Sequence, residues 1–337
     1  MKEAMLYEVL PENGVRCGLC NHGCKIRDGK RGICGVRENR GGKLYSLVYG
    51  KIIAEHVDPI EKKPLFNFLP GSKAFSIGTV GCNFHCKHCQ NFDISQYPKT
   101  HGGEVVGHER TPEQIVAAAK ETDCKTIAYT YTEPTVFFEF AYDTAILAKK
   151  EGLKNIFVSN GYMSNEAAHK IAPYLDAINI DLKAFTEEFY KEICGARLKP
   201  VLDLIQLMKE LGVWVEVTTL IIPGLNDGEQ ELRDIARFVK SIGPDIPWHV
   251  TQFYPTYQLL DLPMTPVATL RRAREIGMEE DLRYVYEGNV PGEGGENTYC
   301  HNCKAVLIER HGLELRANRL QGGKCPECGT KIDGVGM

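Results

Sequence analysis

Residues 74–91, AFSIGTVGCNFHCKHCQN, join a short apolar run to three closely spaced cysteines. The run from Ala74 to Val80 predicts a buried β-strand, and Cys82, Cys86 and Cys89 follow it in a CxxxCxxC pattern. A cubane iron–sulfur cluster has four irons and is normally held by four cysteines, so a compact set of three leaves one iron free to bind another molecule. The pattern therefore predicts an iron–sulfur cluster with one open iron at the end of a strand.

Two other kinds of site fit three cysteines at this spacing. One is a zinc site that takes His85 or His88 as its fourth ligand, and the other is a disulfide with one cysteine left over. Gly78 and Gly81, together with the strand before the cysteines, favour the cluster over both alternatives.

The composition is that of an ordinary globular protein. The 337 residues are 43% hydrophobic and 25% charged, enough for one large domain with one or two small modules. A formal net charge of −4 argues against nucleic acid as the main partner, because phosphate binding relies on clustered cations. The first residues, MKEAMLYEVLPENG, lack the apolar core of a signal peptide, and no run of about 18 apolar residues occurs. We therefore expect a cytoplasmic protein with no membrane partner.

The chain contains 13 cysteines, which we interpret as metal ligands because the cytosol keeps thiols reduced. Cys124 and Cys194 stand outside any cysteine cluster and are predicted to be small buried hydrophobic residues. The other eleven form three clusters: Cys17, Cys20, Cys24 and Cys34; Cys82, Cys86 and Cys89; and Cys300, Cys303, Cys325 and Cys328.

From about residue 73 to 290, short apolar runs alternate with amphipathic stretches, which is typical of parallel strands joined by helices. Prolines at positions 112, 134, 200 and 266 mark helix starts, and glycines at 152, 212, 243 and 277 mark helix ends. We predict an α/β fold, a partial (β/α)6 TIM-type barrel over 73–290. A Cys-rich N-terminal module with a linker precedes it over 1–72, and a C-terminal module follows over 291–337. The six strands are expected at 74–80, 126–131, 155–159, 177–181, 213–221 and 248–254.

Polar residues follow several of the predicted strands, at the end of the barrel where reactive groups gather. Each has a structural explanation by itself: a helix cap at Glu133, a turn at 159–161, and an ion pair between Asp181 and Lys183. Their shared position at one mouth of the barrel favours a common site. The candidate side chains are Glu133, Ser159, Asn160, Asp181, Lys183 and His249.

The last cysteine cluster consists of two CxxC pairs separated by VLIERHGLELRA, which has strand character. Four thiolates in two such pairs predict a zinc-ribbon or rubredoxin-like module with a closed, structural metal site. Zinc is favoured, with iron as the alternative. The first cluster has the spacing CxxCx3C followed by Cys34, and either zinc or an auxiliary iron–sulfur cluster fits it.

The CxxxCxxC triplet after a first strand resembles the radical S-adenosylmethionine (SAM) enzymes. The resemblance implies that SAM binds the open iron of a [4Fe-4S] cluster, that one electron cleaves it, and that a 5′-deoxyadenosyl radical abstracts hydrogen from a substrate. It also implies that Glu133 contacts the SAM ammonium and that the segment of Ser159 and Asn160 approaches the ribose and carboxylate. The remaining implied SAM contacts are Lys183 to the carboxylate, Asp181 beside a cation, and His249.

The barrel also resembles the pyruvate formate-lyase activating enzyme, and the whole chain is similar to the radical SAM proteins of the AmmeMemoRadiSam group. The residues that carry the latter resemblance include YTYTEPTVFFEF, INIDLKAF, LIIPGLND, WHVTQFYP and YVYEGN. We expect an external one-electron donor and a small-molecule, peptide or protein substrate, with Memo and AMMECR1-type proteins as implied partners. The alternatives are a glycyl-radical activating enzyme and a non-catalytic zinc scaffold.

Overall fold

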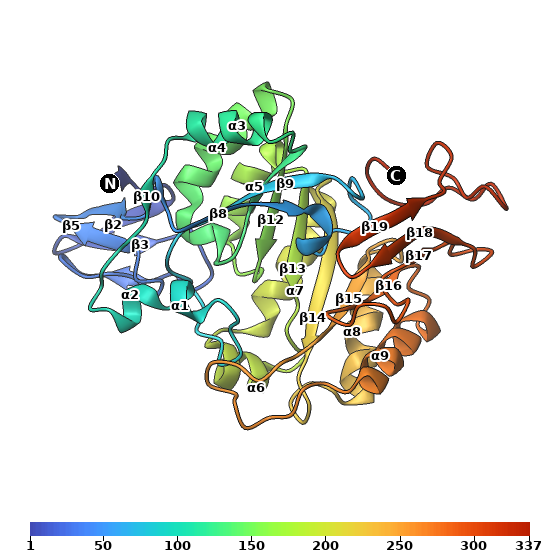
Figure 1. Cartoon of the computed structure of the whole chain (residues 1–337). Helices are drawn as coiled ribbons and strands as arrows, with labels where there is room; N and C mark the ends of the chain where they lie inside the picture. Colours follow the sequence, from blue (N-terminus) through green and yellow to red (C-terminus); the bar gives the residue numbers. More distant parts are fainter.

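The computed structural model describes residues 1–337, and an eight-stranded sheet runs through its centre (Figure 1). All six predicted strands are confirmed, and they pair in parallel in chain order. Two further strands were missed: one pairs in antiparallel register at one edge, and one in parallel register at the other. The edge strands do not pair with each other, so the sheet remains open. From edge to edge the strands are β8 (Ala54–Pro59), β9 (Lys73–Gly78), β11 (Thr126–Tyr129), β12 (Lys154–Ser159), β13 (Ala177–Asp181), β14 (Trp214–Ile221), β15 (Trp248–Gln252) and β16 (Val285–Gly288).

Helices connect successive strands. Helix α3 begins at Pro112, where the sequence predicts a helix start. Thr111 is its N-cap and forms a capping box with Gln114 in the first turn. None of the helices is both long and apolar enough to cross a membrane. The main connecting helices are α3 (Pro112–Glu121), α4 (Phe138–Lys150), α5 (Asn165–Ile171), α7 (Leu198–Glu210), α8 (Glu229–Ile242) and α9 (Val267–Glu279).

Pro200 lies in the first turn of α7, which begins at Leu198, as the sequence predicts. One predicted helix end is wrong. Helix α9 runs on to Glu279, so Gly277 lies inside it. A Cβ at Gly277 would come within 2.7 Å of Val285 and 3.1 Å of the Trp248 ring. Glycine is needed there because the helix approaches the sheet closely, not because the helix ends.

One face of the sheet packs on the helices, and the other face is polar in its central strands. Asn179 pairs in register with Glu216, and Thr218 pairs with His249, so these side chains share the inner face. The segment after β8, which includes the short helix η1 (Ile60–Lys62), fills the interior below them. The backbone N–H groups of residues 66 and 67 donate to Glu216, and Asn179 donates to the carbonyl of residue 64.

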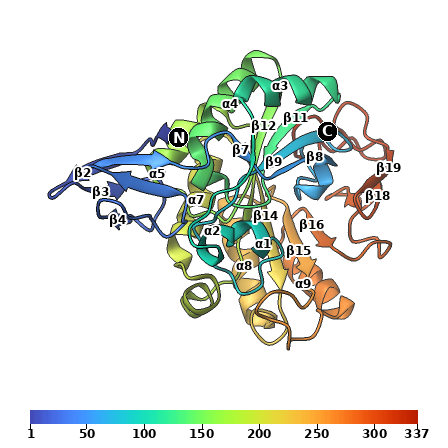
Figure 2. The ribbon, with the colours of Figure 1, turned by 60° about the vertical axis from the view of Figure 1, so that its left-hand side comes forward.

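The two cysteine-rich modules lie at different edges of the barrel, as both views show (Figures 1 and 2). In the N-terminal module, Arg37 makes a bidentate, fully buried ion pair with Glu139 of α4, with both N···O distances 2.9 Å. In the C-terminal module, buried Arg310 donates to the carbonyl of Phe66 and stacks over its ring. The module strands are β1 (Lys2–Glu3), β2 (Tyr7–Leu10), β3 (Gly14–Cys17), β4 (Lys25–Ile26), β5 (Arg37–Arg40) and β6 (Lys43–Ser46), and then β17 (Thr298–Tyr299), β18 (Val306–His311) and β19 (Glu314–Asn318).

Candidate active site

The cysteine triplet lies on a loop between β9 and the short helix α1 (Phe92–Ser95). A segment that follows β13 holds this loop, because the backbone N–H groups of His85 and Lys87 donate to the carbonyls of Cys194 and Ile193, at 3.1 and 3.0 Å. Gly195, with a φ of 71°, lets the two segments approach closely. A Cβ at Gly195 would lie 1.9 Å from the His85 ring. No local sequence motif indicates that residues 193–195 hold the triplet loop.

The three triplet sulfurs are spread apart, since they do not all lie within 4.8 Å of one another. One tetrahedral zinc would bring its thiolates to about 3.8 Å from each other, as follows from a Zn–S bond of about 2.3 Å. Thiolates on different irons of a cubane lie about 6 Å apart. The backbone N–H of Phe84 donates to the Cys82 sulfur at 3.4 Å, and Ser95 contacts the Cys89 sulfur at 3.3 Å. The three sulfurs therefore do not form the compact set that a single tetrahedral ion requires, and three thiolates are a donor set that a cubane can use.

Cys86 has a second environment, because its sulfur lies within 4.8 Å of both His88 and Cys194. Cys194 is buried, as predicted, but it also contacts a triplet cysteine. The contact with Cys194, together with burial, raises the pKa of Cys86. Burial and the charge of Lys183 lower the pKa of His88 to about 3, so its imidazole is neutral and can act as a metal ligand. Cys86, His88 and Cys194 are thus the three residues here that could bind a single zinc ion, the alternative to the cluster.

Glu133 ties the ends of β11 and β12 together beside the triplet. Its Oε1 accepts hydrogen bonds from the backbone and hydroxyl of Thr135 and from Ser159, and its Oε2 accepts from the backbone N–H of Asn160. The structural explanation as a helix cap is thus confirmed. All these donors are neutral and burial raises the pKa of Glu133, so a buried carboxylate without a cation lies next to Cys82. An ammonium group would fit this environment.

Ser159 and Asn160 are buried and hydrogen-bonded within the protein. Besides its bond to Glu133, Ser159 accepts from the backbone N–H of Gly161 at 3.1 Å. The Asn160 amide donates to Asn83 at 2.8 Å and contacts the Cys82 sulfur at 3.8 Å. Both side chains hold the end of β12 against the triplet loop.

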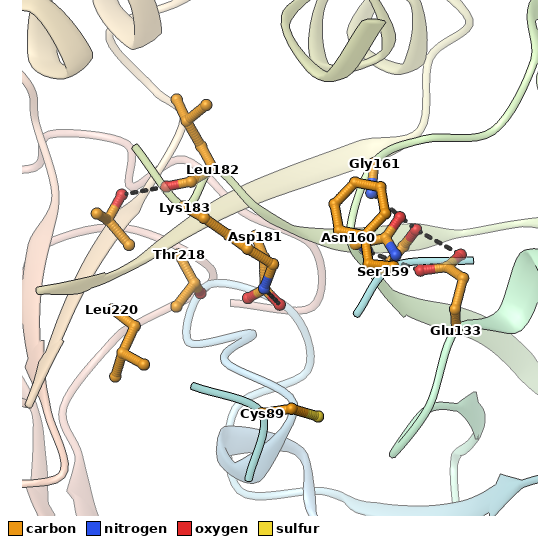
Figure 3. A network of polar contacts seen from close by, with 12 residues as sticks. Cys89, Glu133, Ser159, Asn160, Gly161, Asp181, Leu182, Lys183, Thr218 and Leu220 are labelled. Atoms are coloured by element: carbon orange, nitrogen blue, oxygen red, sulfur yellow. Dashed lines mark hydrogen bonds and ion pairs between the residues drawn. The ribbon is translucent and has the colours of Figure 1, made fainter. Parts of the chain in front are cut away.

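Asp181 and Lys183 form an ion pair of 2.9 Å at the end of β13. Burial alone would lower the pKa of Lys183, but the charges of Asp181 and Cys86 raise it well above its ordinary value. Lys183 therefore stays charged near the triplet. Figure 3 shows Asp181 beside Lys183 and Glu133 beside Ser159 and Asn160, with Cys89 below both groups in this view.

His249 lies deeper, as the second residue of β15. Its Nε2 is 2.6 Å from Glu216, and its ring packs against Phe66 and Tyr286. Glu216 also accepts from two backbone N–H groups and from Trp214, so it is an acceptor at this contact. Nε2 therefore donates to Glu216, and Nδ1 has no hydrogen-bond partner in the protein.

The segment after β15 reaches back to the triplet. The backbone N–H of Gln258 donates to the carbonyl of Lys87 at 3.0 Å. Tyr257 stacks on Phe92, with ring centroids 4.6 Å apart and planes 12° from parallel. The sequence analysis assigned no role to this segment, which lies against the triplet loop.

The eight remaining cluster cysteines fall into two separate sites. In the C-terminal module all four sulfurs lie within 4.8 Å of one another, with Cys300 3.6 Å from Cys328 and Cys303 3.6 Å from Cys325. In the N-terminal module, Cys17, Cys20, Cys24 and Cys34 line a common cavity.

Comparison with known proteins agrees with this geometry. The family model of the radical SAM superfamily matches residues 76–239. An uncharacterized protein of Methanocaldococcus jannaschii is 48% identical to the chain over 336 residues, which cover 99% of each protein. The pyruvate formate-lyase-activating enzyme of Clostridium pasteurianum is 22% identical over 215 residues, covering 61% of this chain and 89% of that enzyme.

A solved structure shares the fold. The crystal structure of SuiB from Streptococcus suis, bound to S-adenosylmethionine, aligns with a TM-score of 0.51 and 13% identity, covering 68% of this chain and 53% of SuiB. The predicted resemblances in the barrel, including the one to pyruvate formate-lyase activating enzymes, are confirmed.

Proposed function

The chain belongs to the radical SAM superfamily, and on that premise we propose that its reaction takes place where β9, β11, β12 and β13 end, with Cys82, Cys86 and Cys89 as ligands of a [4Fe-4S] cluster. When bound, the cluster and SAM supply a one-electron reductive cleavage of SAM and abstraction of a hydrogen atom from a substrate. The observation that carries the proposal is the position of the three cysteines on the loop after β9, inside the residues that match the radical SAM family, because three thiolates on a cubane leave a fourth iron without a cysteine.

We propose that two charged groups bind the methionine part of SAM. Lys183 keeps its charge, and its ammonium suits the SAM carboxylate, while Asp181 holds the lysine in place or takes part in binding a cation. The buried carboxylate of Glu133 suits the SAM ammonium through Oε2, which has one protein donor where Oε1 has three.

For Ser159, Asn160 and His249 we propose more limited roles in SAM binding. Ser159 and Asn160 shape the pocket through their protein hydrogen bonds. His249, whose Nε2 is occupied by Glu216, has Nδ1 left for a polar group of SAM. These polar groups orient SAM, and the segment with Gln258 helps to keep water from the triplet.

The test is anaerobic incubation with SAM and dithionite, with 5′-deoxyadenosine as the measured product. We expect formation of 5′-deoxyadenosine by the iron-loaded wild type. A brown, iron-loaded protein that forms no 5′-deoxyadenosine under these conditions would contradict the proposal. A colourless wild-type protein that binds only zinc would favour the alternative of a non-catalytic zinc scaffold.

A second candidate function is glycyl-radical activation of a partner protein, and the similarity to a pyruvate formate-lyase-activating enzyme favours it. Electron paramagnetic resonance of a candidate partner after reaction distinguishes the two, because only activation leaves a stable glycyl radical on the partner. The two cysteine modules outside the matched residues 76–239 favour a different substrate.

We also propose membership of the AmmeMemoRadiSam group, on the motifs along the whole chain, with Memo and AMMECR1-type proteins and an external one-electron donor as partners in the cytoplasm. Addition of such proteins to the 5′-deoxyadenosine assay tests this, since a true partner or its product raises the turnover. For the C-terminal module we propose a single tetrahedral ion, because the sulfur pairs are 3.6 Å apart, and zinc is favoured because two CxxC pairs are typical of structural zinc sites.

A further inference from the structure

The N-terminal cysteines surround a cavity that the proposed reaction does not use. Its volume is about 340 Å³, counting its opening to solvent. Besides the four cysteines, the lining residues are apolar (Leu19, Ile26, Ile33 and Val136), polar (His22, Arg37, Asn83 and Thr135) and Gly32. None of the 13 cysteines forms a disulfide, and four free thiols that line one cavity indicate a metal site.

The positions of the sulfurs differ between the two four-cysteine sites and favour different metals. No three of Cys17, Cys20, Cys24 and Cys34 lie within 4.8 Å of one another, whereas all four C-terminal sulfurs do. The same protein thus contains a compact four-cysteine site and a spread one. A tetrahedral ion requires sulfurs about 3.8 Å apart, and a cubane requires them about 6 Å apart.

Two unpartnered hydrogen-bond donors supply an independent observation. Nε of Arg37 and Nδ2 of Asn83 are buried without a partner, and both residues line the cavity. Both side chains are buried, with Arg37 2% and Asn83 1% exposed. A buried donor without an acceptor is costly, and the sulfides and thiolates of an iron–sulfur cluster are acceptors.

We propose that Cys17, Cys20, Cys24 and Cys34 bind a second cubane iron–sulfur cluster, with one cysteine on each iron. Because no iron is left open, this cluster binds neither SAM nor a substrate. It is separate from the catalytic cluster in its ligands, and the proposal stands or falls independently of the proposed function.

The residues on either side of Cys82, Gly81 and Asn83, pack against the N-terminal module that contains the second site. Gly81, next to Cys82, packs on the N-terminal module so closely that a Cβ there would lie 3.0 Å from the Cys34 carbonyl oxygen and 2.6 Å from Val36. Asn83, on the other side of Cys82, lines the cavity, and its carbonyl is 2.8 Å from Nε2 of His22. A cluster bound in this cavity would therefore be a direct neighbour of the triplet.

The test removes the catalytic ligands and leaves the N-terminal module untouched. The variant Cys82→Ala/Cys86→Ala/Cys89→Ala, purified anaerobically from the full chain, is analysed for iron, sulfide and zinc and by electron paramagnetic resonance after reduction. We expect about four irons and about four sulfides per chain, a brown colour, and a reduced-cluster signal that SAM does not change. Wild type is expected to hold about eight irons.

A reciprocal variant, Cys20→Ser/Cys24→Ser, should lose about four irons and keep a signal that SAM alters. The proposal is overturned if the triplet variant contains no iron, or if it contains zinc in place of iron at the N-terminal module. If the reciprocal variant does not fold, the triplet variant still decides. Loss of the SAM response with iron retained at both sites would contradict the proposed function and leave the second cluster standing.

Discussion

Cys86 is the side chain at which two metal sites compete. As part of the triplet it would bind one iron of a cubane, and with His88 and Cys194 it forms a trio compact enough for one ion. The trio contains only one of the three triplet cysteines, so it would leave Cys82 and Cys89 unused. The cubane accounts for all three, and it leaves Cys194 as a neighbour of the cluster.

Substitution at the two cysteines separates these sites. Cys86→Ala is expected to abolish 5′-deoxyadenosine formation, because the cubane loses one of its three ligands. Cys194→Ala is expected to keep the iron of the triplet and at least about a third of the activity, since a buried cysteine-to-alanine change usually costs only about 1 kcal/mol of stability. Equal activity in wild type and Cys86→Ala, or loss of triplet iron in Cys194→Ala, would contradict the proposed ligand set.

Lys183 permits a graded test of SAM binding. Lys183→Gln removes a charge-assisted hydrogen bond, which contributes about 1.5–3 kcal/mol, so SAM affinity should fall by about 10- to 150-fold. Equilibrium binding of SAM to the iron-loaded, unreduced protein measures this directly. The matched control is Lys209→Gln, which breaks an ion pair with Asp245 in the last turn of α7. Equal SAM affinity in both variants would remove Lys183 from the site.

The strands of the sheet show what the sequence can and cannot predict. Six central strands are short, almost fully buried segments in which apolar and β-branched residues predominate, and this composition between helical stretches identifies them. Strand β8 was missed because it is an edge strand, and its sequence AEHVDP is polar and mostly accessible. Strand β16 was missed because its sequence, VYEG, has only two apolar residues before a glutamate and a glycine.

In the candidate site, too, some residues could be predicted from the sequence and others could not. The triplet and the pair of Asp181 and Lys183 could be predicted because each is a local motif at a strand end. Cys194 and Gly195 could not, because their contacts with the triplet loop depend on the π-turn η4 (Tyr190–Cys194) and on packing between distant segments. A cysteine–glycine pair shortly after a strand that ends in the site was the only local signal.

Helix α4 anchors the N-terminal module through one buried ion pair. Glu139→Gln would leave the charge of Arg37 buried without a counter-charge, and we expect the free energy of unfolding to fall by about 3–5 kcal/mol. Urea denaturation measures the change. The control Glu151→Gln removes an exposed ion pair with Lys120 at the other end of the α4 region and should have little effect. Similar midpoints for the two variants would show that Arg37 does not anchor the module.

The C-terminal module contacts the barrel through Glu61 and Phe66 and makes no hydrogen bond to a triplet cysteine, so we expect its metal to act through structure. Arg310 binds the carbonyl of Phe66, the backbone N–H of Phe66 donates to Glu216, and Glu216 holds His249. This chain of contacts connects the module to the inner face of the sheet. The segment it crosses is also fixed by an ion pair of 2.7 Å between Lys63 and Asp58, which does not depend on the module.

Loss of the C-terminal zinc should therefore loosen the last residues without removing the chemistry. Cys328→Ala is expected to lose about one zinc per chain and to make residues 291–337 roughly tenfold more sensitive to limited proteolysis, because metal binding supplies much of the folding free energy of such small modules. The iron content should stay at the wild-type value, and 5′-deoxyadenosine should still form. Cys124→Ala, a buried cysteine outside every cluster, is the control and should keep both metals. Loss of iron together with zinc in Cys328→Ala would mean that the C-terminal module supports the cluster site directly, through the contacts from Arg310 to His249.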